Sequence, residues 1–124
     1  MIEYNEKAKS LIPLTESTFM IILSLLQPRH GYEVMQVASR LSGGRVKIGP
    51  GTLYGALNVL VKQGLIERRG ERETEGERRK IYGLTPLGDE IVRLECSRLE
   101  NLASAARAAL EGSAEKIEEN QDVR

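Results

Sequence analysis

Residues 49–64 read GPGTLYGALNVLVKQG, and this stretch decides the fold. A proline near the start suits the first turn of a helix, because its missing N–H would have no partner there. The pair Gln63-Gly64 predicts the end of that helix. Between these signals the apolar residues recur every three or four positions, which predicts one buried face formed by Leu53, Ala56, Leu57, Leu60 and Val61.

The opposite face of this helix is polar and is predicted to be exposed. It carries Thr52, Tyr54, Gly55, Asn58 and Lys62. A buried stripe holds such a helix in place and leaves these residues free to contact a partner.

Two more helices are predicted upstream. The apolar segment TESTFMIILSLLQ, residues 15–27, should end before Pro28, and YEVMQVASRL, residues 32–41, should end at Gly43-Gly44. The first ten residues are expected to form a loose arm or a short helix. The three residues at 46–48, Val-Lys-Ile, could form a minimal strand.

A β-hairpin is predicted downstream of the central helix. Two β-like runs, residues 65–69 and 79–84, flank the charged segment GERETEGER, which suggests a long mobile tip. Three helices followed by a hairpin is the order of a winged helix-turn-helix. The expected fold class is therefore α+β, mainly α.

The last predicted helix begins at Thr85-Pro86, an N-cap residue followed by proline, and runs to about Leu110-Gly112. Such a helix is too long to be buried against a small head, so its apolar stripe predicts dimerisation. We therefore divide the chain into a head with an N-terminal arm, residues 1–85, and a dimerisation helix with a polar tail, residues 86–124. The stripe consists of Leu87, Ile91, Leu94, Leu99, Leu102, Ala106 and Leu110.

The formal net charge of zero conceals an asymmetry. Residues 1–85 hold 13 basic and 9 acidic residues, whereas residues 86–124 hold 5 and 9, so the head is basic. The single cysteine excludes an intrachain disulfide and favours a reducing compartment. The longest apolar run, residues 19–26, is too short to span a bilayer, so we expect a cytoplasmic protein.

The sequence offers nothing that predicts an enzyme. It contains no glycine-rich phosphate loop with a lysine, and one histidine, His30, leaves no catalytic triad and no multi-histidine metal site. We therefore expect no catalytic residues, no metal and no cofactor. His30 is predicted to be a helix-start residue.

Three motifs carry a family resemblance: LTESTFMIILSLL with PRHGYEVM, then GPGTLYGALNVLVKQGLIE, then RRKIYGLTPLGDEI. Together they resemble the PadR family of transcriptional regulators over most of residues 13–92, and GTLYxAL and YxLTxxG are the more specific parts. The single C-terminal helix is similar to the smaller PadR subclass. The resemblance implies a homodimeric repressor on a near-palindromic operator, with the third helix in the major groove and the wing on the phosphate backbone. Half-sites should lie roughly 34 Å apart.

The exposed face of the third helix supplies the first candidate DNA contacts. Thr52 and Tyr54 can donate hydroxyl hydrogen bonds to phosphates, Asn58 matches an adenine edge, and Lys62 is cationic. In the competing interpretation Tyr54 packs its ring on the second helix and Asn58 is merely solvated. Gly55 departs from the family, in which this position is often long or cationic.

The predicted wing and the loop before the third helix supply the second set of candidates. These are Arg78, Arg79 and Lys80 in the wing, and Arg45 and Lys47 in the loop. Strand alternation should turn Arg79 away from its two neighbours. Alternatively, the wing cations form a solvated charge run balanced by Glu71, Glu73, Glu75 and Glu77.

Three alternatives stay open. The fold could be a protein-interaction module that no longer binds DNA, as the zero net charge and Gly55 suggest. Cys96 could be a redox switch, although a small buried residue is the commoner role. Family members often respond to a small-molecule effector, and Phe19, Tyr4 and Tyr82 could line a small pocket for one.

Overall fold

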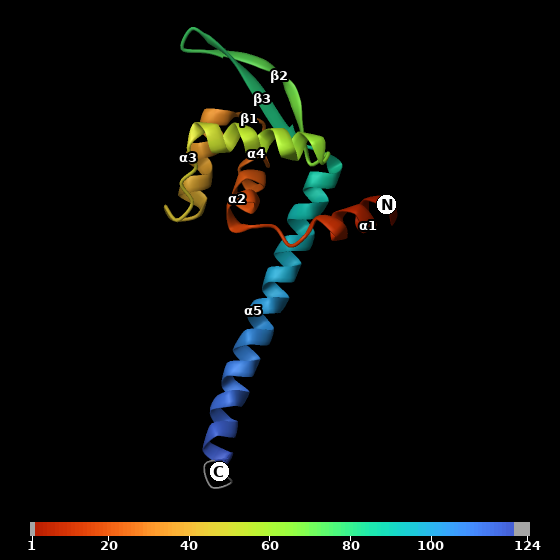
Figure 1. Ribbon diagram of the computed structural model, residues 1–124, viewed down its shortest axis with the longest axis vertical. Coiled ribbons are helices and arrows are strands. Elements are labelled where there is room, and N and C mark those ends of the chain that lie inside the picture. The colour runs from red at the N-terminus through yellow and green to blue at the C-terminus, as the bar shows by residue number, and fades with distance from the viewer. Residues whose placement is uncertain (1, 121–124) are drawn as a thin grey trace. The chain divides into compact units, whose positions relative to one another are not determined.

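The computed structural model describes the backbone of residues 2–120 and the side chains of residues 6–113. Two compact units are present, Met1–Leu94 and Glu95–Arg124. In Figure 1 the β2–β3 hairpin extends beyond the helices of the first unit. In chain order the elements are α1 (Ile2–Leu11), α2 (Glu16–Ser24), β1 (Arg29–His30), α3 (Gly31–Leu41), α4 (Pro50–Lys62), β2 (Ile66–Thr74), β3 (Glu77–Leu84) and α5 (Pro86–Asn120).

The winged helix-turn-helix fold class predicted from the sequence is confirmed. Helices α2, α3 and α4 precede the β2–β3 wing, and the arm at the N-terminus forms the helix α1. One hydrophobic core joins these elements, and its buried members include Ile22, Val34, Leu53, Leu57, Leu60, Leu65 and Ile91.

Helix α4 begins as predicted, with Gly49 at the N-cap and Pro50 in the first turn. Leu53, Leu57 and Leu60 are buried, but Val61 is 39% exposed, so its predicted burial is wrong. Each residue turns a helix by about 100°, and the buried stripe is too narrow to include the residue after Leu60.

The sheet has three antiparallel strands in the order β1-β3-β2. The third strand is Arg29–His30, which the sequence did not predict and which pairs with Tyr82 and Ile81. Residues 46–48, which the sequence suggested could form a minimal strand, are irregular. Val46 is anchored instead by burial and by donating its N–H to the Ser42 hydroxyl, 2.9 Å away.

The expected long mobile tip of the hairpin is wrong, because β2 and β3 pair up to Thr74 and Glu77. The turn is Glu75-Gly76, and both residues adopt positive φ angles, 53° and 79°. Such angles are those of the tight turns that match the strand twist. Opposite charges face each other across the strands at Glu71–Lys80 and Glu73–Arg78, which favours pairing in a segment that looked like a polar loop.

Helix α5 continues past the predicted end at Gly112 to Asn120, and residues 121–124 of the expected tail lie outside the described residues. Leu87 and Ile91 are 3% and 0% exposed and belong to the core of the first unit. Their predicted role in dimerisation is therefore wrong, since their side chains pack inside the chain itself. Leu94 is partly buried against the same core.

The remaining members of the stripe on α5 present apolar surface. Leu99, Leu102 and Leu110 are 40%, 58% and 71% exposed, and Ala106 is also exposed. No helix among the described residues is both long enough and apolar enough to cross a membrane.

Candidate nucleic-acid interface

The outward face of α4 presents the polar residues that the sequence predicted to be exposed. Thr52, Asn58 and Lys62 are exposed, and Tyr54 is 45% exposed. Val59, 53% exposed, also lies outside the core and was not predicted on this face, because an apolar side chain is ordinarily expected on the buried side of a helix. Its position two residues after the buried Leu57, a rotation of about 200°, could have indicated this exposure.

Tyr54 also packs on the first residue of α3. A Cβ atom added to Gly31 would lie 2.7 Å from the Tyr54 Oη and 2.9 Å from two of its ring carbons. The alternative left open by the sequence placed the Tyr54 ring on the helix predicted at residues 32–41, which is α3 in the structure. The contact with Gly31 agrees with that alternative. The residue is still 45% exposed beside the N-terminus of α3.

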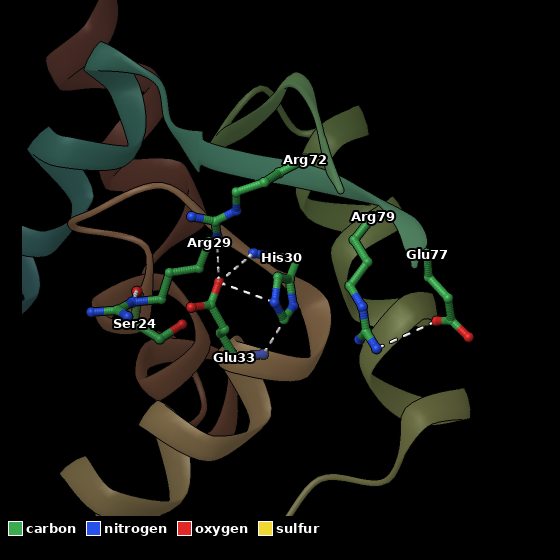
Figure 2. Close-up of polar contacts among 7 residues, drawn as sticks. All are labelled: Ser24, Arg29, His30, Glu33, Arg72, Glu77 and Arg79. Atoms are coloured by element: carbon green, nitrogen blue, oxygen red, sulfur yellow. Dashed lines mark hydrogen bonds and ion pairs between the residues drawn. The ribbon is translucent and has the colours of Figure 1, made fainter. Parts of the chain in front are cut away.

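His30 caps the N-terminus of α3, as predicted. Its Nδ1 accepts a hydrogen bond from the Glu33 N–H at 3.3 Å, and the His30 N–H donates to the Glu33 carboxylate at 3.2 Å (Figure 2). This reciprocal capping box satisfies two of the unpaired donors at the start of the helix.

The same Glu33 carboxylate ties α3 to the wing. Arg72 on β2 donates to Glu33 Oε1 at 2.8 Å, across 39 positions of sequence (Figure 2). On β3 the guanidinium of Arg79 lies 5.8 Å from the centre of the Tyr32 ring. The first turn of α3, through Glu33 and Tyr32, therefore contacts both strands of the wing.

The cap predicts a dependence of stability on pH. Burial lowers the pKa of His30 below 6.5, and Arg79 and Arg72 act in the same direction, while Glu33 opposes them. A lowered pKa favours the neutral ring in the folded state, so the contribution of His30 is complete above about pH 6.5 and decreases as the pH falls below that value. A protonated Nδ1 also cannot accept the Glu33 N–H.

We therefore expect His30→Ala to lower the free energy of unfolding by about 1–2 kcal/mol at pH 7.5. His30→Asn, which restores a capping acceptor, should recover part of this loss and remove the component of pH dependence due to His30 below about pH 6.5. Urea denaturation followed by circular dichroism tests both points. Identical pH profiles for wild type and His30→Asn would contradict the assignment.

Alternation in β3 separates the wing cations as expected. Arg78 is exposed and its Nε lies 3.4 Å from the Glu71 carboxylate, whereas the Arg79 side chain is only 26% exposed and faces Tyr32. Lys80 is exposed and forms no ion pair with the residues whose side chains are described. Arg79, a predicted phosphate contact, is thus turned toward the protein.

The two loop candidates differ in their surroundings. Arg45 forms an ion pair with Glu16 on α2, at 3.0 Å, and remains 74% exposed. Lys47 is exposed on the loop that leads into α4. Lys47 is therefore the freer cation of the two.

The remaining sequence candidates find little support as ligand sites. Cys96 is exposed rather than buried, and its thiol lies 3.6 Å from Glu100. No group of three or more metal-ligating side chains occurs within the described part of the chain. Tyr82 is a core residue, Phe19 is half-buried, and the side chain of Tyr4 lies outside the described residues.

Comparisons with known proteins give a consistent picture. The model of the transcriptional regulator PadR-like family matches residues 20–93. A 37.1 kDa transposon-encoded protein of Streptomyces fradiae is 33% identical over 72% of this chain, which spans 25% of that protein's length. Among solved structures, a transcriptional regulator from Clostridium thermocellum is 26% identical, with a TM-score of 0.59 over 74% of this chain and 89% of its own. Bacillus subtilis PadR in complex with operator DNA is similar in fold, with 21% identity and a TM-score of 0.56 over 65% and 46% of the two chains.

Proposed function

The chain belongs to the PadR-like family of transcriptional regulators, and from this we propose that it represses transcription as a homodimer on a near-palindromic operator. The observation that carries the proposal is the exposed polar face of α4 beside a wing that is fixed to α3 by Arg72–Glu33. Bacillus subtilis PadR, a protein of similar fold, has been crystallised with operator DNA. As a transcriptional regulator the chain is not an enzyme.

In this proposal α4 enters the major groove. Asn58 can read an adenine edge, and Lys62 and Thr52 can contact phosphates. Tyr54, a half-exposed residue beside α3, can do the same through its hydroxyl. Gly55 has open space around it, so the backbone of α4 can approach the bases closely.

The wing contributes phosphate contacts through its outward cations. Arg78 and Lys80 point to solvent, whereas Arg79 lies on Tyr32 and is better suited to orienting the wing. We therefore assign phosphate contact to Arg78 and Lys80 and a positioning role to Arg79.

The homodimer is proposed from the exposed half of the stripe on α5. Leu99, Leu102, Ala106 and Leu110 recur every three or four residues, and a second copy of the helix would cover them. Two heads related by a two-fold axis would meet half-sites roughly 34 Å apart. A monomer by light scattering at micromolar concentration would contradict this.

The proposed function is tested by fluorescence anisotropy with the duplex upstream of the protein's own gene and with a scrambled duplex. We expect selective binding that weakens steeply with salt, because binding releases counterions from the phosphates. Equally weak binding to both duplexes would favour the protein-interaction module, for which the paired cations of the wing are the supporting feature.

Since the proposed partner is genomic DNA, we propose a cytoplasmic location. A small-molecule effector stays a prediction.

The wing assignment makes its own prediction. Arg78→Ala/Lys80→Ala should reduce affinity at about 0.1 M salt by about 10- to 100-fold, without changing sequence preference. The slope of log K against log salt should become shallower by about 1 to 2. Arg93→Ala/Arg107→Ala, which removes the same charge from α5, is the matched control. If both double variants bind alike, the wing makes no specific phosphate contact.

A further inference from the structure

Val59 is an apolar residue on the outward face of α4. It is 53% exposed, whereas Leu57 and Leu60 of the same helix are buried in the core. Since each residue turns the helix by about 100°, Val59 lies on the same side as Gly55 and Lys62. A valine in this position weakens the helix, because its branched side chain loses rotamer freedom, and it leaves apolar surface in water.

Gly55, one turn before Val59, is also not explained by contacts within the chain. A Cβ atom added there would have no atom within 4 Å among the described residues, apart from its chain neighbours and the backbone of its own helix. The residue also lacks the positive φ angle that would require glycine. Alanine would fit and would favour the helix. The outward face of α4 thus carries two residues that weaken it, and such departures from local rules are expected where a second molecule binds.

The composition of this face indicates which partner it suits. Helix α4 contains no acidic residue, and the exposed Lys62 gives the face a positive charge. Both features fit the major groove of duplex DNA, whose phosphates are negative. Thymine presents a methyl group in that groove, and an apolar side chain can recognise it. Because Gly55 has no side chain, the backbone beside Val59 can come close enough for a short valine to reach a base.

We propose that Val59 packs on the C5 methyl group of a thymine in each half-site and so selects thymine at that position. The inference rests on the proposed function and deepens it, because it names a base that α4 reads. Asn58 lies about 100° around the helix from Val59, so it reads a different position. Val59 is thus a specificity-determining residue, whereas the cations of the head hold the backbone without distinguishing bases.

The test uses the full chain and a duplex that the wild type selects from a random-sequence library. Each thymine of one half-site is replaced in turn by deoxyuridine, which removes the C5 methyl group and keeps the hydrogen-bonding groups of the base. One replacement should weaken wild-type binding about fourfold, the factor expected for losing one buried methyl contact. Val59→Ala should weaken binding to the unmodified duplex about fourfold in each half-site and be insensitive to deoxyuridine at that same position.

Val61→Ala is the matched control, because it makes the same change in the same helix about 200° away from Val59. Val61 is 39% exposed, and its variant should keep the full sensitivity to deoxyuridine. Thermal unfolding confirms that each variant is folded.

Gly55→Ala separates a role in binding from a role in folding. It should raise the thermal unfolding midpoint, because alanine is the better helix former, and yet weaken binding at least as much as Val59→Ala, because the added methyl group holds the helix away from the bases. Gly112→Ala, the same change in α5, should leave binding unchanged. If Gly55→Ala binds like the wild type, α4 does not approach the bases closely enough for Val59 to reach one.

Two further outcomes overturn the proposal in distinguishable ways. If the wild type selects a duplex but no thymine position separates it from Val59→Ala, then Val59 does not read thymine, while the proposed function stands. If the wild type selects no duplex and shows no salt-sensitive binding, the proposed function fails and the assignment of Val59 fails with it.

Discussion

Gly88→Ala is expected to lower the free energy of unfolding by about 3 kcal/mol or more, a large fraction of the stability of a small domain. A Cβ atom at this position would lie 2.1 Å from the carbonyl oxygen of Leu65 and 3.2 Å from Leu84 Cδ2. The first of these contacts is with backbone, so no side-chain rotation can relieve it.

The backbone around Gly88 has little freedom to move. The Leu65 carbonyl accepts the Thr85 N–H at 3.1 Å, and the Thr85 hydroxyl donates to the Gly64 carbonyl and accepts the Gly88 N–H. Any shift of α5 that made room for a methyl group would break this set of hydrogen bonds. The start of α5 is therefore held against the junction between α4 and β2.

Gly112→Ala is the matched control, because it makes the same change in the same helix with nothing within 4 Å of the added atom. It should leave stability unchanged or raise it by up to about 1 kcal/mol, since alanine is the better helix former. Urea denaturation followed by circular dichroism measures both variants. Equal stability of Gly88→Ala and wild type would show that α5 does not approach Leu65 so closely.

Removing Tyr54 should produce the largest loss of DNA affinity from a single side chain. Hydrogen bonds to charged groups contribute about 1.5–3 kcal/mol, so Tyr54→Ala should weaken binding by about tenfold or more. Tyr54→Phe, which keeps the ring on Gly31, should lose a similar affinity without losing stability. If Tyr54→Phe binds like the wild type, the hydroxyl does not contact phosphate.

Gly31 provides an independent way to move the same ring. In the wild type, Gly31→Ala places a methyl group 2.7–2.9 Å from Tyr54 and should displace it, lowering both DNA affinity and stability. In the Tyr54→Ala background the same change should be neutral or stabilising by up to about 1 kcal/mol, because alanine suits the first turn of α3. Anisotropy and denaturation are measured for the wild type, the two single variants and the double variant, which together form a double-mutant cycle. If Gly31→Ala changes affinity and stability equally in the wild type and in Tyr54→Ala, the two residues are not in contact.

Local signals in the sequence were sufficient for the helices of the head. Pro50 and the Leu53–Leu57–Leu60 spacing determine where α4 begins and which face it buries, and both act within one helix. The motif glycine at position 88 was visible as part of a family resemblance, but its physical reason, contact with a carbonyl 23 positions earlier, depends on tertiary packing.

The wing shows where such local reasoning stops. Its glutamates and arginines resemble a polar loop when the sequence is considered alone. Which of them face each other, such as Glu71 and Lys80, depends on the register between β2 and β3, and the order of residues along one strand does not determine that register. The ion pair of Arg72 with Glu33 and the stacking of Arg79 on Tyr32 join distant segments and leave no periodic signal. For the stripe on α5 the reason is different. Leu87 and Ile91 are buried in the core but follow the same three-to-four-residue spacing as the exposed Leu102, so spacing alone does not distinguish buried from exposed positions.

The matched charges of the wing bear on how the protein would search a chromosome. Residues 66–84 contain five glutamates and six cations, so the hairpin carries a net charge of only +1. Sequence-independent attraction to DNA scales with the number of phosphates neutralised, and this hairpin neutralises few of them. In the proposed role, few molecules would be held on the vast excess of non-operator sites, so a small number of copies per cell would suffice to occupy an operator.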